Sequence, residues 1–189
     1  MCTVQIYKGP VREPCETINY RNTGGKWPGF ARSDHFAVRW TSMLRIRRTG
    51  NYYFSIISDD GSKLWIDNRY TINNDGLHGW RNRMAIKRLR AGSHRVKIEM
   101  FERGGHAGML FRYKGPDTGN RWKVVRSGVG GSGWSEKAFY FGQGTRCPNL
   151  NGRRANMARV IKVEAQLSKV HVRINNCAPK TLWVVPSSK

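Results

Sequence analysis

The sequence predicts an all-β protein, an antiparallel β-sandwich or barrel. Short runs rich in β-branched and aromatic residues recur along the chain, and glycine or aspartate bounds most of them. Several runs alternate apolar and polar residues, which is typical of a strand with one buried face. No segment keeps apolar residues at helical spacing for more than two turns.

The first three expected strands cover residues 36–40, 51–57 and 63–67. The second follows a Thr49-Gly50 turn and the third follows Asp60-Gly61, so these two are predicted to form a hairpin. A further pair is predicted at 95–101, which alternates strictly, and 108–113. We expect these to be antiparallel partners across the loop 102–107.

The amino-acid composition of the chain changes after residue 118. We predict one domain over residues 3–118, a Gly-rich connector over 119–138 with an exposed segment at 127–133, and a basic C-terminal stretch over 139–189. That stretch contains two possible strands, 160–164 and 170–174. It is either an extension that packs on the domain or the truncated start of a second module.

Charge points to an anionic partner. The chain holds 34 Lys and Arg against 12 Asp and Glu, a net charge of +22, and only two of those acids follow residue 119. An acidic polysaccharide or a nucleic acid would suit this surface, although a solvated basic surface is an equal alternative. No helix-turn-helix, zinc-finger or aromatic RNA-binding motif supports the nucleic acid.

The four cysteines do not have metal-binding spacing. Cys2 with Cys15, and Cys147 with Cys177, are candidate disulfides, but four cysteines allow three connectivities and free thiols are as plausible. No apolar run of 18 residues is present, so no membrane span is predicted. The N-terminus lacks the features of a signal peptide.

Asp59 and Asp60 stand side by side in a chain poor in acids, and two adjacent carboxylates repel unless cationic groups lie between them. They belong to an ordered series of motifs, which comprises residues 36–41, 50–54, 58–67, 73–79, 89–94 and 101–108. This series resembles the protective-antigen (PA14) domain family, found in a bacterial toxin component, in flocculins and adhesins, and in glycoside hydrolases. The resemblance covers residues 3–118.

The resemblance implies a non-catalytic β-sandwich that binds carbohydrate. In lectin members of the family the two aspartates are joined by a cis peptide and hold Ca²⁺, and a vicinal diol of the sugar completes the coordination. Asp59 and Asp60 match that pair, and calcium favours such oxygen ligands. The alternative is a plain turn capped by aspartates.

A second loop in the family supplies a further oxygen ligand and the side chains that select the sugar. The matching residues here are Glu102, a candidate calcium ligand, and the candidate ligand-binding residues Arg103, Gly104, Gly105 and His106. Arg103 suits an anionic sugar. Trp80, in a polar loop, is the candidate for stacking on sugar, whereas Trp65 is expected in the core.

Catalysis is not expected. Adjacent aspartates do not flank a scissile bond as glycosidase carboxylates do, and no nucleophile elbow or zinc-protease helix is present. We therefore expect a calcium-dependent glycan-binding module of a secreted or cell-surface, adhesin-like protein, with the missing leader explained by an incomplete N-terminus. The alternatives are a module that binds polyanions and a structural assembly domain.

Overall fold

The computed structural model describes residues 4–7, 17–125, 133–142, 144–161 and 171–174. The chain divides into two units, residues 14–163 and a smaller unit of 1–13 with 164–189. In the smaller unit β1 (Val4–Tyr7) pairs antiparallel with β13 (His171–Ile174), which overlaps the strand predicted at 170–174.

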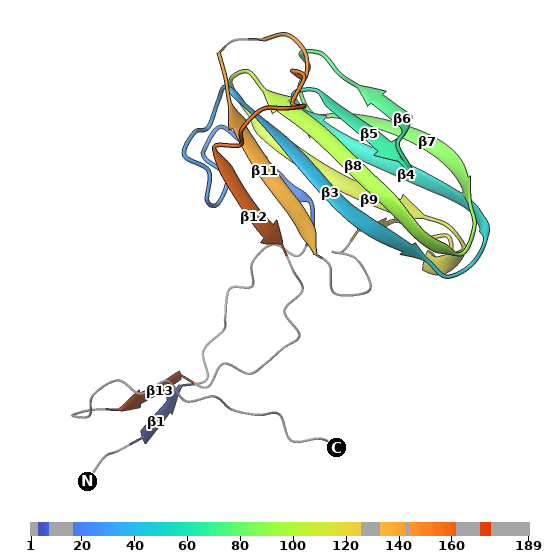
Figure 1. Ribbon diagram of the computed structural model, residues 1–189, viewed down its shortest axis with the longest axis horizontal. Coiled ribbons are helices and arrows are strands. Elements are labelled where there is room, and N and C mark those ends of the chain that lie inside the picture. The colour runs from blue at the N-terminus through green and yellow to red at the C-terminus, as the bar shows by residue number, and fades with distance from the viewer. Residues whose placement is uncertain (1–3, 8–16, 126–132, 143, 162–170, 175–189) are drawn as a thin grey trace. The chain divides into compact units, whose positions relative to one another are not determined.

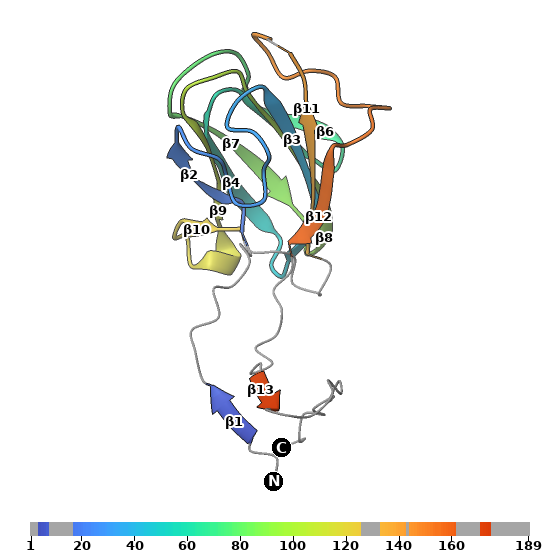
Figure 2. The ribbon, with the colours of Figure 1, turned by 90° about the vertical axis from the view of Figure 1, so that its left-hand side faces the viewer.

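The larger unit consists of two antiparallel sheets that face each other (Figures 1 and 2). The six-stranded sheet has the order β12 (Met157–Ile161), β11 (Trp134–Tyr140), β3 (Phe36–Ile46), β8 (Gly92–Glu102), β5 (Ser62–Ile66), β6 (Arg69–Asn74). The five-stranded sheet has the order β10 (Lys123–Val124), β9 (Ala107–Lys114), β4 (Gly50–Asp59), β7 (Arg81–Leu89), and β2 (Asn19–Thr23) also pairs with β9. The one helical element of the described chain is a 3₁₀ turn, η1 (Pro116–Thr118).

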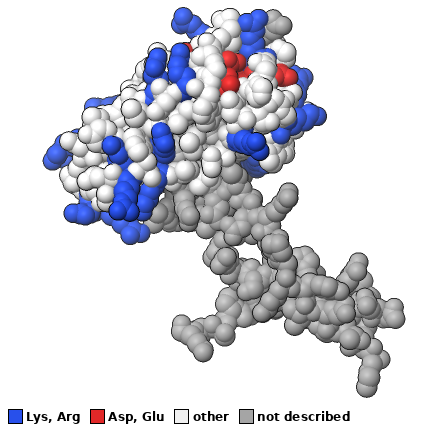
Figure 3. Space-filling view, turned by 180° about the vertical axis from the view of Figure 1, so that it is seen from behind, with Lys and Arg blue, Asp and Glu red and all other residues white. Residues whose placement is uncertain are grey.

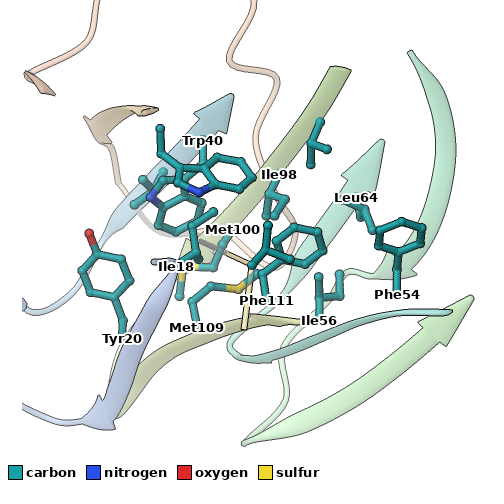
Figure 4. Packing of buried hydrophobic residues seen from close by; sticks show 14 of the residues in the cluster. Ile18, Tyr20, Trp40, Phe54, Ile56, Leu64, Ile98, Met100, Met109 and Phe111 are labelled. Carbon is teal, nitrogen blue, oxygen red and sulfur yellow. The ribbon is translucent and has the colours of Figure 1, made fainter. Parts of the chain in front are cut away.

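The core lies between the sheets and is built from alternate residues of each strand. Figure 4 shows Trp40 and Ile98 of the six-stranded sheet meeting Phe111 of the five-stranded sheet, and all three are fully buried. Each such side chain contributes about 1.5–3 kcal/mol when it leaves water. The predicted all-β sandwich is confirmed.

Both predicted hairpins are wrong. Strand β4 pairs with β7 and β9, whereas β5 pairs with β6 and β8, so residues 60–61 cross from one sheet to the other. Likewise β8 and β9 lie in different sheets, joined by residues 103–106. Alternation along a strand shows which side chains are buried, but it does not show which strand is the neighbour.

The sandwich continues beyond the boundary predicted at residue 118. Strand β11 pairs with β3, with Ala138 opposite Val38, and β12 pairs with β11, which overlaps the strand predicted at 160–164. The described residues of 139–161 therefore pack on the domain as an extension, and Leu150 is buried against Phe101. Within the predicted connector, Gly133 is buried rather than exposed, while 126–132 lie outside the described residues.

A buried carboxylate ties this extension to the core. Glu136 of β11 is fully buried and accepts hydrogen bonds from the Tyr20 hydroxyl, from Trp40 Nε1 at 2.7 Å and from Arg159 Nε at 2.6 Å. These partners come from β2, β3 and β12. Burial, and then the Glu136 charge, raise the pKa of Tyr20 far above its usual value, so Tyr20 remains a donor. The four strands are thus held by one acceptor.

Of the four cysteines, Cys147 lies within the described residues. Its thiol is free and donates to the Gly61 carbonyl at 3.5 Å, and burial raises its pKa. The predicted pairings involve Cys2, Cys15 and Cys177, which lie outside the described residues. Among the helices of the described chain, none has the length and apolar character that a membrane span requires.

Candidate functional site

The two crossings between the sheets lie side by side at one end of the sandwich. Asp59, the last residue of β4, is opposite Gly108 of β9, and Ser62, the first of β5, is opposite Met100 of β8. Because both strand pairs are in register, the segments that join them, 60–61 and 103–106, are neighbours. The two motifs predicted to supply the site are therefore brought together.

The Asp59–Asp60 peptide bond is cis, as the resemblance implied. Asp60 accepts the His78 N–H on Oδ1 at 3.2 Å and the Arg103 N–H on Oδ2 at 3.0 Å. Asp59 Oδ2 accepts Nδ2 of Asn22 at 3.2 Å. Each carboxylate oxygen has two lone pairs, so both side chains keep capacity for a cation. Asp59 is half-buried, and this burial raises the pKa of its carboxyl group. The Asn22 hydrogen bond lowers that pKa, whereas the charge of Asp60 raises it further.

Glu102 lies beneath this pair. It is fully buried, its Oε2 accepts the Asp60 N–H at 3.1 Å, and its Oε1 has no hydrogen-bond partner among the described residues. Burial, followed by the charge of Asp60, raises the pKa of Glu102 to about 8. Among the described residues no three His, Cys, Asp or Glu side chains form a metal-binding cluster. Glu102 as a calcium ligand stays a prediction.

This carboxyl gives a test by pH. Because the pKa of Glu102 is higher in the folded protein than in the unfolded chain, its protonation stabilises the fold. This stabilisation is complete below the unfolded pKa, near 4.5, and is lost as the pH rises towards 8. With chelator present, Glu102→Gln should remove the loss, which we expect to be on the order of 2 kcal/mol because neighbouring carboxylates share the titration. Thermal unfolding of both proteins from pH 5 to pH 8 measures it. Parallel pH profiles would show that Glu102 does not titrate in this range.

An open hollow of about 580 Å³ lies beside the pair, lined by Asp60, Arg103, Gly104 and Gly105 together with Asp34, His35 and Leu77. Sequence reasoning identified the first four and missed the other three. Asp34 accepts the Gly105 N–H at 3.1 Å and so holds the second loop. Residues 34–35 precede β3 and carry no motif of their own, so no signal in the sequence marked them.

Trp80 and His106, two of the candidate ligand-binding residues, are both exposed, and their contact with sugar stays a prediction. Trp80 is 45% exposed and its ring covers Gly108, where an added Cβ would come within 2.6 Å of Cζ3. His106 is exposed, and its charge when protonated lowers the pKa of Asp59. The placement of Trp65 in the core was wrong. Its neighbours in β5 face the core instead, and Lys97 Nζ lies 3.7 Å from the Trp65 ring centroid on the outer face.

The residues at this end are compatible with calcium. Asp59 and Asp60 supply carboxylate oxygens, and the Oδ1 atom of Asn22, beside Asp59, is buried with no hydrogen-bond partner in the described part of the chain. Calcium accepts six to eight oxygens from carboxylates, amides, backbone carbonyls and water. A cluster of three acids is therefore not required, and the unpartnered amide oxygen is a third candidate ligand.

The family model for the PA14 domain matches residues 28–124. The chain belongs to the PA14 domain family. No curated protein matches it. The family match ends before β11, so in this PA14 chain the six-stranded sheet includes two strands, β11 and β12, beyond the matched segment.

Two solved structures contain the same fold, and a third is similar to part of the chain. An anti-sigma factor domain-containing protein aligns over 77% of this PA14 chain and 52% of its own length, at 20% identity and a TM-score of 0.53. Another from Clostridium clariflavum is 28% identical over 60% of this chain and 38% of its own, with a TM-score of 0.49. This chain thus spans about half of the first protein and less of the second. A PA14 sugar-binding domain from an RTX adhesin aligns over 60% of this chain and 76% of its own, at 19% identity and a TM-score of 0.50.

Proposed function

We propose that this chain is a calcium-dependent, non-catalytic carbohydrate-binding module of a secreted or cell-surface, adhesin-like protein. The observation that carries the proposal is the cis-linked pair Asp59–Asp60 beside an open hollow formed with the second loop. The adhesin domain with the same fold is described as sugar-binding, which supports the assignment.

Asp59 and Asp60 would hold the ion, with the Asn22 amide turned so that Oδ1 faces it. Bound Ca²⁺ would accept two neighbouring sugar hydroxyls as ligands. Glu102 acts indirectly, because its hydrogen bond to the Asp60 N–H orients the pair. The His78 and Arg103 amides orient the Asp60 carboxylate in the same way.

Trp80 and Arg103 supply sugar contacts around the ion. Trp80 covers Gly108, which is opposite Asp59, so its exposed ring is placed to stack on the apolar face of a bound sugar. Arg103 lines the hollow, and its guanidinium forms no ion pair within the described part of the chain. A carboxylate or sulfate on the sugar would pair with it.

Binding without catalysis suits this arrangement. The two aspartates are consecutive residues at one crossing, whereas hydrolysis requires carboxyl groups about 5–10 Å apart on either side of the scissile bond. An extracellular location follows from the calcium requirement, because millimolar calcium fills a site with an affinity of about 10⁻⁴–10⁻³ M.

A glycan array probed with and without chelator tests the proposal. Binding to neutral sugars should be lost in chelator, and Asp59→Asn should weaken it by about 100-fold because one charged ligand is removed. Asp67→Asn is the matched control, since Asp67 follows the opposite end of β5 and bonds His94 and Arg95. Neutral-sugar binding that survives chelator and Asp59→Asn would refute the calcium-dependent site.

A further inference from the structure

The five-stranded sheet is rich in cations and almost free of acids. Its strands hold eight Lys or Arg residues, one in β2, four in β7, two in β9 and one in β10. Their single acidic residue is Asp59, at the end of β4. Figure 3 shows the side of the molecule opposite to Figure 1. There, blue side chains are spread widely and the red ones gather in one small patch near one end.

These cations are not neutralised from within the described chain. Its ion pairs are Arg39–Glu99, Lys97–Glu99, Lys63–Asp75, His94–Asp67 and Arg159–Glu136. All of these cations belong to the six-stranded sheet. The cations of the five-stranded sheet therefore have no acidic partner within the described chain, although Arg81 and Lys87 donate hydrogen bonds to Asn74 Oδ1 and to the Ile66 carbonyl.

Aromatic rings hold the central cations of this sheet in place. The guanidinium carbon of Arg112 lies 5.1 Å from the centroid of the Trp122 ring. Lys114 Nζ lies 5.2 Å from the same ring and 4.6 Å from that of Tyr53. Arg112 Nε also donates to Ser55 Oγ at 3.2 Å. Because these side chains are already ordered, less conformational entropy is lost when they bind an anion.

An apolar strip lies next to these cations. Lys114 of β9 is opposite Tyr53 of β4, which in turn is opposite Ile86 of β7. Ile86 and Met84 are each 59% exposed, and Tyr53 is 37% exposed. Charged groups thus flank a flat apolar surface, which suits a polymer with both anionic groups and apolar ring faces.

We propose that the outer face of the five-stranded sheet binds an acidic polysaccharide, carboxylated or sulfated, through Arg112 and Lys114. Single-stranded nucleic acid fits this face less well, because its bases require open aromatic faces and the Trp122 ring has two cations over it. This surface is separate from the Asp59–Asp60 site. Gly108 is opposite Asp59, and Arg112 lies four residues further along β9, a distance of about 13 Å. It therefore does not depend on the proposed function.

Calorimetry with polygalacturonate in excess chelator at low salt tests this surface. The unmodified chain should bind, and its affinity should fall steeply as salt rises. The double variant Arg112→Gln with Lys114→Gln should bind at least about 10-fold more weakly. Arg45→Gln with Arg69→Gln is the matched control, since both arginines are exposed on the six-stranded sheet and the net charge changes equally. It should lose less than about twofold.

Three outcomes would overturn the proposal: no binding in chelator at low salt, an equal loss in the control variant, or tighter binding of a single-stranded DNA oligonucleotide through the same two residues. The location of the binding surface can also be checked without any variant. Bound polygalacturonate should protect Lys114 of the unmodified chain from chemical acetylation, as measured by mass spectrometry. Asp59→Asn should leave this binding unchanged, so a failure of the calcium site and a failure of this surface are distinguishable.

Discussion

Replacement of Glu136 by alanine is expected to lower the free energy of unfolding by about 3–5 kcal/mol. The carboxylate is fully buried and accepts hydrogen bonds from Tyr20, Trp40 and Arg159. Its removal leaves the Arg159 guanidinium without its anion and two buried donors without an acceptor, and each unmade bond adds a desolvation cost. Urea unfolding of the whole chain, followed by tryptophan fluorescence, measures the change.

Lys137 provides the control for this experiment. It is the next residue of β11 and its side chain is exposed, so Lys137→Ala changes the same strand without touching the core. The expected loss is within about 0.5 kcal/mol. If the two variants unfold alike, the Glu136 network does not anchor β11, and the extension is held by its apolar contacts alone.

Gly61→Ala is expected to destabilise the sandwich by about 2–3 kcal/mol and to abolish any calcium-dependent glycan binding. A Cβ at Gly61 would lie 2.7 Å from both the backbone N and O of Gly76 and 2.5 Å from Phe101 Cε1. Backbone atoms cannot turn away as a side chain can, so the segment around Gly76 must move. That segment leads to His78, whose N–H orients the Asp60 carboxylate.

Gly79→Ala is the matched change in the same loop. Nothing lies within 4 Å of a Cβ added at Gly79, so the variant should unfold within about 0.5 kcal/mol of the unmodified chain. Thermal unfolding and glycan binding of both variants complete the comparison. Equal behaviour of the two would show that close packing at Gly61 does not position Asp60.

The strands were predictable because alternation is a local property. The runs at 36–40 and 95–101 lie within β3 and β8, and all of their apolar side chains are buried. The pairing of these strands was not predictable from the same signal. A hairpin and a crossing between sheets both require a short turn with Gly or Asp, and the choice depends on which neighbour buries the apolar face.

Some residues of the candidate site could also be predicted from the sequence, whereas others could not. The family motifs identified Asp59, Asp60 and the loop 102–107, which the two crossings bring together. Asn22, with its unpartnered amide oxygen, and Asp34, which holds Gly105, come from segments without a motif. Glu102 was predicted as a calcium ligand by its position in the loop, but its burial and its bond to the Asp60 amide depend on the packing of β8.

The all-β class, the PA14 resemblance and the adjacent aspartates were evident from the sequence alone, because composition, alternation and motif order are local properties of the chain. Three features emerged from the three-dimensional fold: β11 and β12 complete the six-stranded sheet, Trp65 faces outward, and the cations of the other sheet have no acidic partner among the described residues. These features join residues far apart in the chain, as Tyr20 joins Glu136. Such contacts are selected by the joint burial of the two sheets, which no local pattern encodes.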